Sequence, residues 1–153
     1  MVSDCIAAIS TAPAAGGVAI IRISGAGALA VAAKVFAPSG RRAVKDFRPR
    51  YMYAGSISGA GGITDFGLCV YFRAPRSFTG EDVVELHCHG GVELSRAVLK
   101  AVILAGARPA RAGEFTMRAF INGKLSLSAA EGLADMINGK SAAEVRAGSL
   151  LYS

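Results

Sequence analysis

Apolar residues recur along the first 110 residues in short runs that predict a mixture of strands and helices. Strands are expected over residues 5–10, 18–23 (central, because nearly all apolar), 50–57, 63–73 and 83–88, with a short edge strand over 108–111. Helical spacing predicts one helix over 25–36, capped by Ser24, and another over 92–105, stopped by Gly106. The glycine-rich run 58–62 is typical of a hairpin, and the run 11–17 of a tight turn.

The predicted strand 83–88 has two different faces. Alternation places Val84, Leu86 and Cys88 on a face that we expect to lie against the core, so Glu85 and His87 point the other way. A carboxylate on a rigid strand can accept two parallel N–H bonds from a planar amidine-like edge, such as that of arginine, a pterin or a guanine ring. Glu85 is therefore a candidate binding residue, and the alternative is a solvent-facing glutamate paired with a nearby arginine.

Two cations also stand out. Arg22 shares a face of its strand with Val18 and Ile20, so its charge either extends to water or meets an anion. Further along, Asn122-Gly123 predicts a turn that presents Lys124 as a compact, mobile charge.

The residue pattern changes near position 120, where alanine-rich helical runs begin. Ser128-Ala-Ala-Glu131 and Ser141-Ala-Ala-Glu144 are capping-box patterns, and each opens an alanine-rich helical run. We therefore expect an α+β body over residues 1–120, with a small mixed or antiparallel sheet and two main helices, followed by the beginning of an all-helical domain over 121–153.

Two short motifs lack the structural context that phosphate binding or metal binding requires. Residues 134–141 nearly match a phosphate-binding loop, but they lie within helical periodicity rather than after a strand. The triplet His87-Cys88-His89 is a poor metal site, because alternation sends the thiol away from both imidazoles. No arrangement of residues indicates a catalytic group, so no catalytic residue and no metal site is predicted.

Composition limits the class of protein. The 153 residues are 52% hydrophobic and 18% charged, which is typical of one folded domain with or without an appendage, and no apolar run approaches the length of a membrane span. The N-terminus lacks the basic start of a signal peptide. Three cysteines in apolar stretches (Cys5, Cys69 and Cys88) favour buried thiols in a reducing cytoplasm.

The net charge of +6 is partly local. Five basic residues fall within ten positions and are opposed there only by Asp46: Arg41, Arg42, Lys45, Arg48 and Arg50. With Phe47, Tyr51 and Tyr53 nearby, this stretch is a nucleic-acid footprint, a solvated loop or a site for an acidic ligand, and the sequence leaves all three open.

Several long segments, in order, resemble the N-terminal part of the MnmE (TrmE) family of tRNA modification GTPases. The resemblance is carried by Asp4-Cys-Ile-Ala-Ala-Ile9, Gly16-Gly-Val-Ala-Ile-Ile-Arg-Ile-Ser-Gly25, Ser77-Phe-Thr-Gly-Glu-Asp-Val-Val-Glu-Leu86, His89-Gly-Gly91 and Gly113-Glu-Phe-Thr-Met-Arg-Ala-Phe-Ile-Asn-Gly-Lys-Leu125. It covers nearly the whole chain and is weakest over residues 37–62.

The resemblance implies a fold similar to the tetrahydrofolate-binding domain of glycine-cleavage T-proteins. It also implies homodimerisation and binding of 5-formyltetrahydrofolate or 5,10-methylenetetrahydrofolate near the dimer interface. The family's folate-contacting residues fall on Arg22, Glu85 and Lys124 of this sequence. Glu85 suits the amino edge of the pterin, whereas Arg22 and Lys124 suit ligand oxygens or the anionic glutamate tail.

The resemblance further implies a longer cytoplasmic protein that modifies the wobble uridine of tRNA together with an FAD- and NADH-dependent MnmG-type partner. GTP, Mg and K would belong to a GTPase domain whose motifs this sequence lacks, so the chain itself is expected to be inactive on GTP. Ala14-Ala15 and Ser126 depart from the family pattern, in which Pro-Arg and Asp are usual. Two rival functions are a basic nucleic-acid-binding module that uses residues 41–50 and a structural dimerisation domain without folate binding.

Overall fold

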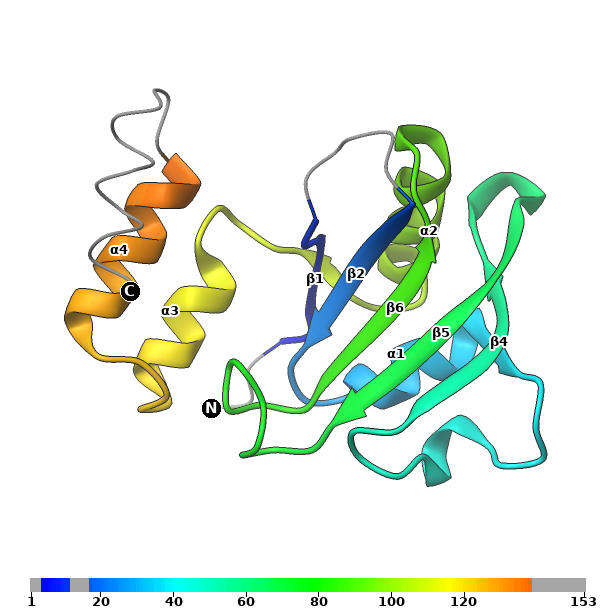
Figure 1. Cartoon of the computed structure of the whole chain (residues 1–153), viewed down its shortest axis with the longest axis horizontal. Helices are drawn as coiled ribbons and strands as arrows, with labels where there is room; N and C mark the ends of the chain where they lie inside the picture. The colour runs from blue at the N-terminus through cyan, green and yellow to red at the C-terminus, as the bar shows by residue number, and fades with distance from the viewer. Residues whose placement is uncertain (1–3, 12–16, 139–153) are drawn as a thin grey trace. The chain divides into compact units, whose positions relative to one another are not determined.

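The computed structural model describes residues 4–11 and 17–138, the last five of these by backbone alone (Figure 1). The chain divides into two compact units, one formed by residues 1–77 and 81–109 and the other by 78–80 and 110–153. The predicted turn over 11–17 lies mostly outside the described residues, as do the Ala14-Ala15 departure and the second capping box at Ser141. The boundary near residue 120 stays a prediction.

The first unit is built on one sheet. Its described strands are β1 (Ile6–Ile9), β2 (Val18–Ser24), β3 (Phe36–Pro38), β4 (Met52–Ser58), β5 (Thr64–Phe72), β6 (Val83–His89) and β7 (Arg108–Pro109). They pair in the order β3-β4-β5-β6-β2-β1-β7, and all neighbours are antiparallel except β1 and β7. The expected mixed sheet with a central second strand is therefore confirmed, and β2 lies between β6 and β1.

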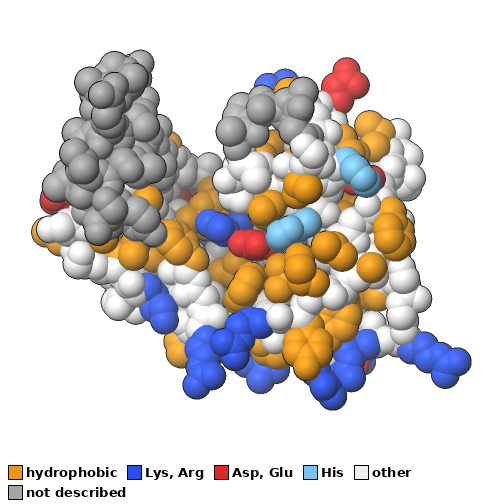
Figure 2. Space-filling view, viewed as in Figure 1, with side chains coloured by type: hydrophobic (Ala, Val, Ile, Leu, Met, Phe, Trp, Pro, Cys, Tyr) orange, Lys and Arg blue, Asp and Glu red, His pale blue; other side chains and the backbone are white. Residues whose placement is uncertain are grey.

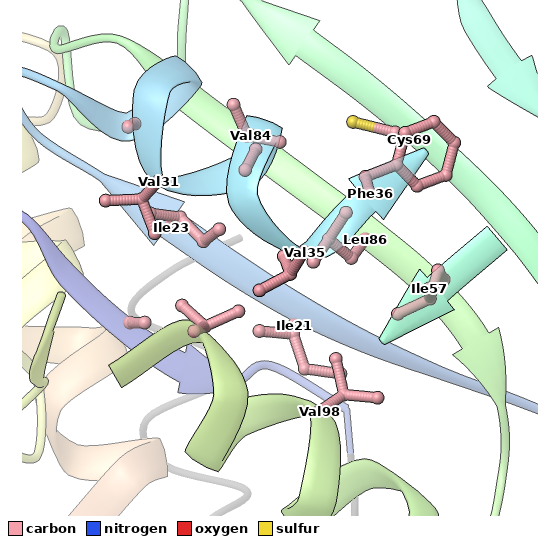
Figure 3. Close-up of a cluster of buried hydrophobic side chains, with 14 of the residues drawn as sticks. Ile21, Ile23, Val31, Val35, Phe36, Ile57, Cys69, Val84, Leu86 and Val98 are labelled. Carbon is pink, nitrogen blue, oxygen red and sulfur yellow. The ribbon is translucent and has the colours of Figure 1, made fainter. Parts of the chain in front are cut away.

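Two helices, α1 (Ala28–Val35) and α2 (Val92–Leu104), pack on one face of the sheet. Figure 3 shows the core between them and the strands, where Ile21, Ile23, Val84 and Leu86 meet Val31, Val35 and Val98. The predicted faces of β6 are confirmed, since Val84, Leu86 and Cys88 are each at most 3% exposed. Each such aliphatic side chain stabilises the fold by about 1.5–3 kcal/mol, and Glu85 and His87, which alternate with this set, point to the opposite face of the sheet.

The prediction that Ser24 caps the first helix is wrong. Ser24 is the last residue of β2, where it pairs with both Ile6 and Val83. Its hydroxyl donates to Oε1 of Glu81 at 2.8 Å, and its oxygen does not accept a helix N–H as a capping oxygen would. The helix begins later, after Gly27, whose φ of 85° suits glycine. Strand pairing on both sides of Ser24 outweighs the local capping preference.

Two further differences come from pairing between distant segments. The predicted helix over 25–36 ends at Val35, and Phe36–Pro38 instead forms the edge strand β3 against β4. Pro38 is tolerated there because an edge strand has one side without a partner. The predicted hairpin around 58–62 is confirmed, with Ser58 opposite Thr64.

The second unit contains α3 (Glu114–Ile121) and α4 (Leu127–Asn138). Within α3, Glu114 and Arg118 form an ion pair at 3.4 Å, and both residues are buried. The helix α4 begins two residues earlier than the capping box at Ser128 predicts, because Ser126 Oγ accepts the Ala129 N–H at 3.1 Å. Ser126 thus caps the helix, a role that the aspartate usual in the family also fills well.

Candidate functional site

Arg22 and Glu85 meet on the face of the sheet that is opposite the two helices of the first unit. They are direct partners in the β2–β6 register. Arg22 donates from Nη2 at 3.2 Å and from Nε at 3.3 Å, both to Oε2 of Glu85. The side chains are only 25% and 16% exposed, so this pair is partly withdrawn from water. The arginine partner named in one of the two sequence alternatives for Glu85 is therefore confirmed, although the glutamate is not solvent-facing, and the ligand site stays a prediction.

His87 completes the cluster from two positions further along β6. Its Nε2 lies 3.1 Å from Oε1 of Glu85, and the imidazole is 20% exposed. The hydrogen bond from His87, together with the charge and hydrogen bonds of Arg22, outweighs burial and lowers the pKa of Glu85. Glu85 is therefore an anion held between two donors. Sequence reasoning placed His87 on the correct face but missed this contact, which the i, i+2 spacing on a strand allows.

Glu85 has limited capacity for further hydrogen bonds. An ionised carboxylate offers about two acceptor positions on each oxygen. Oε2 uses both for Arg22, whereas Oε1 uses one for His87. Among the contacts of the described residues, one position on Oε1 is left for a ligand donor, and a second becomes available on Oε2 when Arg22 gives up one of its two bonds.

The surroundings of the cluster are mostly apolar. By register, Glu85 faces Val70 on β5, and His87 lies between Ile20 and Leu68. Figure 2 shows a basic, an acidic and a histidine side chain adjacent near the centre of the view, with hydrophobic side chains around them. A hollow of about 210 Å³ adjoins His87, lined by Gly17, Val18, Phe66, Gly67, Leu68, Cys88 and His89. This volume is below the range of about 300–1,000 Å³ typical of closed ligand pockets.

His89, at the end of β6, belongs to a different contact. Its ring Nδ1 lies 2.8 Å from Oδ1 of Asp65, and its backbone N–H donates to Oδ2 at 2.9 Å. Cys88 lies on the core face, where burial and the charge of Asp65 raise the pKa of its thiol to about 11. The three consecutive residues thus point to different partners, and no cluster of three potential metal ligands occurs in the part of the chain that the structure describes.

Lys124 belongs to the second unit, so it is described there by itself. The N–H of Gly123 donates to the carbonyl of Phe120, and that of Lys124 to the carbonyl of Ala119, at 3.0 and 2.8 Å. This is a Schellman motif at the end of α3, with Gly123 at a φ of 73°. The predicted turn is confirmed, and Lys124 is exposed.

One neighbour of this turn was not foreseen from the sequence. Asn122 donates from Nδ2 to the Thr79 carbonyl at 2.7 Å, and Thr79 is fully buried. A Cβ placed on Gly80 would lie 2.8 Å from that of Asn122. Residues 78–80 therefore pack on the turn that carries Lys124, a contact between segments more than forty positions apart.

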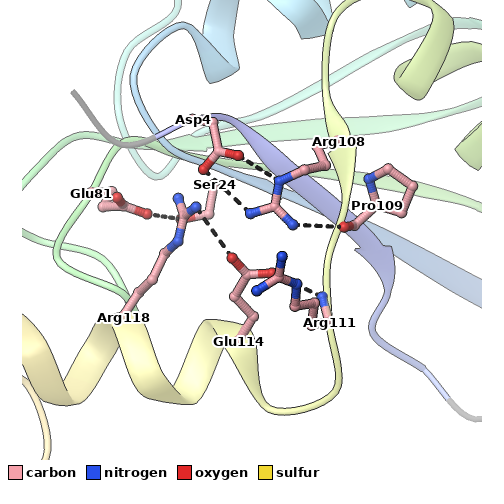
Figure 4. Close-up of polar contacts among 8 residues, drawn as sticks. All are labelled: Asp4, Ser24, Glu81, Arg108, Pro109, Arg111, Glu114 and Arg118. Atoms are coloured by element: carbon pink, nitrogen blue, oxygen red, sulfur yellow. Dashed lines mark hydrogen bonds and ion pairs between the residues drawn. The ribbon is translucent and has the colours of Figure 1, made fainter. Parts of the chain in front are cut away.

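Two other polar contacts hold segment ends in place (Figure 4). In the first unit, Arg108 donates from Nε and Nη2 to the carboxylate of Asp4, which connects β7 to the residues before β1. In the second unit, Glu114 accepts the Arg111 N–H at 2.8 Å at the start of α3. Both contacts serve the fold.

Comparison with known proteins identifies the family. A sequence profile described as the GTP-binding protein TrmE N-terminus matches residues 5–124. The chain belongs to this family. The tRNA modification GTPase MnmE of Roseiflexus castenholzii is 46% identical over 140 residues, and that of Clostridioides difficile 42% over 139. The MnmE of Francisella tularensis subsp. novicida is 46% identical over 138 residues.

These alignments cover 90–92% of this chain and 29–30% of each relative. The chain therefore corresponds to an N-terminal MnmE domain and spans about 30% of the length of the relatives that it matches. None of its described helices is both long and apolar enough to cross a membrane.

Proposed function

We propose that this chain binds a reduced one-carbon folate, 5-formyltetrahydrofolate or 5,10-methylenetetrahydrofolate, as part of a tRNA modification GTPase. The observation that carries the proposal is the half-buried Glu85 carboxylate between Arg22 and His87 on an apolar sheet face. The amino edge of a pterin has two parallel donors that fit such a carboxylate. When bound, the folate would supply the one-carbon unit for modification of the wobble uridine.

The hydrogen-bond capacity of the site is consistent with this ligand. A bidentate edge needs one acceptor position on each carboxylate oxygen, and Oε1 of Glu85 has one to spare. On Oε2 the ligand would replace one of the two Arg22 bonds. The displaced guanidinium N–H would then be available for a ligand oxygen. Arg22 would therefore hold Glu85 in the free site, and would hold both Glu85 and the ligand in the occupied site.

The direct test is titration of the chain with 5-formyltetrahydrofolate by calorimetry. Glu85→Gln keeps the shape of the side chain but removes its charge and turns one acceptor into a donor. Since a hydrogen bond to a charged group is worth about 1.5–3 kcal/mol, we expect affinity to fall tenfold or more. The matched control is Glu93→Gln on the exposed start of α2. Equal affinity of parent and Glu85→Gln would refute the assignment.

Lys124 stays in the proposal on the family resemblance alone. As an exposed cation it would act through solvent-screened charge, which is worth about 1 kcal/mol or less. Lys124→Ala should therefore weaken folate binding less than Glu85→Gln, and the effect should diminish with added salt. An effect larger than that of Glu85→Gln would reverse the proposed order of importance.

We also propose that the chain forms a homodimer. Large apolar side chains are exposed on the strands, including Val18, Met52 and Phe66, each more than half exposed. A partner surface would remove them from water, and it would also cover the small hollow beside His87. Sedimentation at high micromolar concentration should show a dimer, and a single 15.6 kDa species would contradict this.

Hydrolysis of GTP, the MnmG-type partner and action on tRNA in the cytoplasm are proposed for the longer protein to which such a domain belongs. The chain alone should not hydrolyse GTP. The residues that resemble a phosphate loop begin within α4, which extends to Asn138. Saturable micromolar GTP binding that Lys140→Ala abolishes would contradict this.

A further inference from the structure

A second, separate surface of the first unit is basic. The basic stretch 41–50, for which nucleic-acid binding was one of three predictions, lies in the loop between β3 and β4. The loop after β5 supplies two more cations, Arg73 and Arg76, to the same surface. Two adjoining hollows show this convergence. The first, of about 730 Å³, is lined by Arg41, Arg42, Lys45 and Arg73, and the second, of about 250 Å³, by Arg50, Arg73 and Arg76. Arg73 lines both, so the two hollows form one continuous basic surface.

This basic surface holds the whole charge excess of the chain. Its cations are Arg41, Arg42, Lys45, Arg48, Arg50, Arg73 and Arg76. The chain has 17 basic and 11 acidic residues, and without these seven cations and Asp46 the two counts are equal at ten. Asp82 also approaches the loop, but its carboxylate already accepts the Ala74 N–H at 2.8 Å and the Tyr71 hydroxyl at 3.4 Å.

The loop that carries these cations is anchored. Val44 and Phe47 are at most 5% exposed, and Phe47 stacks on Tyr53 with ring centroids 3.8 Å apart. The backbone N–H of Arg50 donates to the backbone carbonyl of Tyr71 at 2.7 Å. All seven side chains are nevertheless exposed, and among the described residues none forms a salt bridge. Figure 2 shows basic side chains gathered along the lower edge of the view.

The shape of the surface favours an extended polyanion over a compact one. A single phosphate or carboxylate is usually held by donors that converge in one closed pocket, whereas these cations are spread along two open hollows. Tyr51 is 55% exposed beside them, and the Arg48 guanidinium lies 5.9 Å from its ring centroid. Cations interleaved with an exposed aromatic ring suit a phosphodiester chain with accessible bases.

We propose that this basic surface binds the phosphate backbone of RNA. The identity of that RNA as tRNA rests on the proposed function, whereas the surface itself is independent of the Arg22–Glu85 site. The seven cations lie mainly in the segment where the resemblance to the family is weakest. The proposal therefore rests on this chain's own loop residues and not on the family resemblance.

The test uses the whole chain and an unmodified, fluorescently labelled tRNA transcript. Binding is followed by anisotropy at salt concentrations between 50 and 200 mM. The double variant Arg42→Ala/Arg73→Ala removes one cation from each loop. Arg96→Ala/Lys100→Ala, on the exposed side of α2, removes the same charge elsewhere. Each lost phosphate contact reduces the salt slope by roughly 0.7–0.9, so we expect the test variant to bind tenfold or more weakly at 100 mM salt, with a shallower slope.

Three outcomes would overturn the inference: no tRNA binding by the parent, equal losses in the test and control variants, or equally effective competition by polyglutamate at matched charge. The folate titration separates this proposal from the other one. Arg42→Ala/Arg73→Ala should keep folate affinity, and Glu85→Gln should keep tRNA affinity. Absence of folate binding with intact, salt-dependent tRNA binding would refute the folate proposal and support this one.

Discussion

Arg22 and Glu85 are 63 positions apart in the chain, yet they are direct cross-strand partners with Nη2 3.2 Å from Oε2. The Arg22 guanidinium balances the Glu85 carboxylate before any ligand arrives, and His87 contacts the other carboxylate oxygen. Such a cluster holds the carboxylate in one orientation, which reduces the entropy lost on binding. The same contacts also affect stability.

The lowered pKa of Glu85 makes a prediction about acid stability. The His87 hydrogen bond is the largest cause of the shift, so the ionised form is favoured in the folded state. A carboxyl whose pKa is depressed by folding stabilises the protein above its unfolded pKa of about 4.3, and this contribution is lost as the pH falls through the folded pKa. The difference in unfolding free energy between parent and Glu85→Gln, measured in urea, should therefore decrease from pH 6 to pH 3.

The control for that experiment is Glu93→Gln, at an exposed position on α2, and the decrease should be larger for Glu85→Gln than for this control. A difference from the parent that stays constant for Glu85→Gln would mean that the ion pair contributes no pH-dependent stability.

Gly67 on β5 should not tolerate a side chain. A Cβ at this position would collide with the backbone carbonyl oxygen of His87, which strand pairing prevents from moving. Overpacking of this kind typically costs 1–3 kcal/mol, so Gly67→Ala should lower the unfolding free energy by about that amount. Gly40→Ala is the matched control, since a Cβ there meets no atom within 4 Å. Equal stabilities of the two variants would contradict the close approach of β5 and β6.

Ser126, and not Ser128, should determine the stability of the start of α4. Ser126→Ala removes the acceptor for the Ala129 N–H, at a typical cost of about 1 kcal/mol, so exchange of that amide should accelerate roughly fivefold. Ser126→Asp should keep the cap and the slow exchange. Ser128→Ala should change little, and acceleration by this variant instead would restore the capping box that the sequence indicated.

Two of the three cysteines should be inert in the folded protein. Burial raises the pKa of Cys69 to about 12 and that of Cys88 to about 11, so neither is a thiolate near neutral pH. Ellman's reagent at pH 8 should modify only the partly exposed Cys5 at an appreciable rate, and Cys5→Ser should remove that reaction. In guanidinium all three should react. Rapid labelling of Cys88 in the folded state would contradict its burial.

The sequence by itself determined the elements with strong periodicity and the faces of β6. The alternation of Val84, Leu86 and Cys88 with Glu85 and His87 is a local property, and the core accepts only the apolar set. The Asn122-Gly123 turn was equally local, because the left-handed conformation at Gly123 needs no distant partner. The resemblance to the family supplied the candidate site residues Arg22, Glu85 and Lys124, and alternation placed Glu85 on the face of the sheet opposite the helices.

Only the tertiary structure decided which groups meet. Strand pairing placed Arg22 opposite Glu85, since register depends on the whole sheet and not on either strand. It also turned Ser24 from a helix cap into a strand end, and Phe36–Pro38 from a helix end into an edge strand. Strand pairing also places Arg73 beside Arg41 and Arg42, because the pairing of β4 with β5 brings the loop before β4 next to the loop after β5. Contacts between distant segments depend on how all the apolar faces are buried at once, and no local window of sequence contains that information.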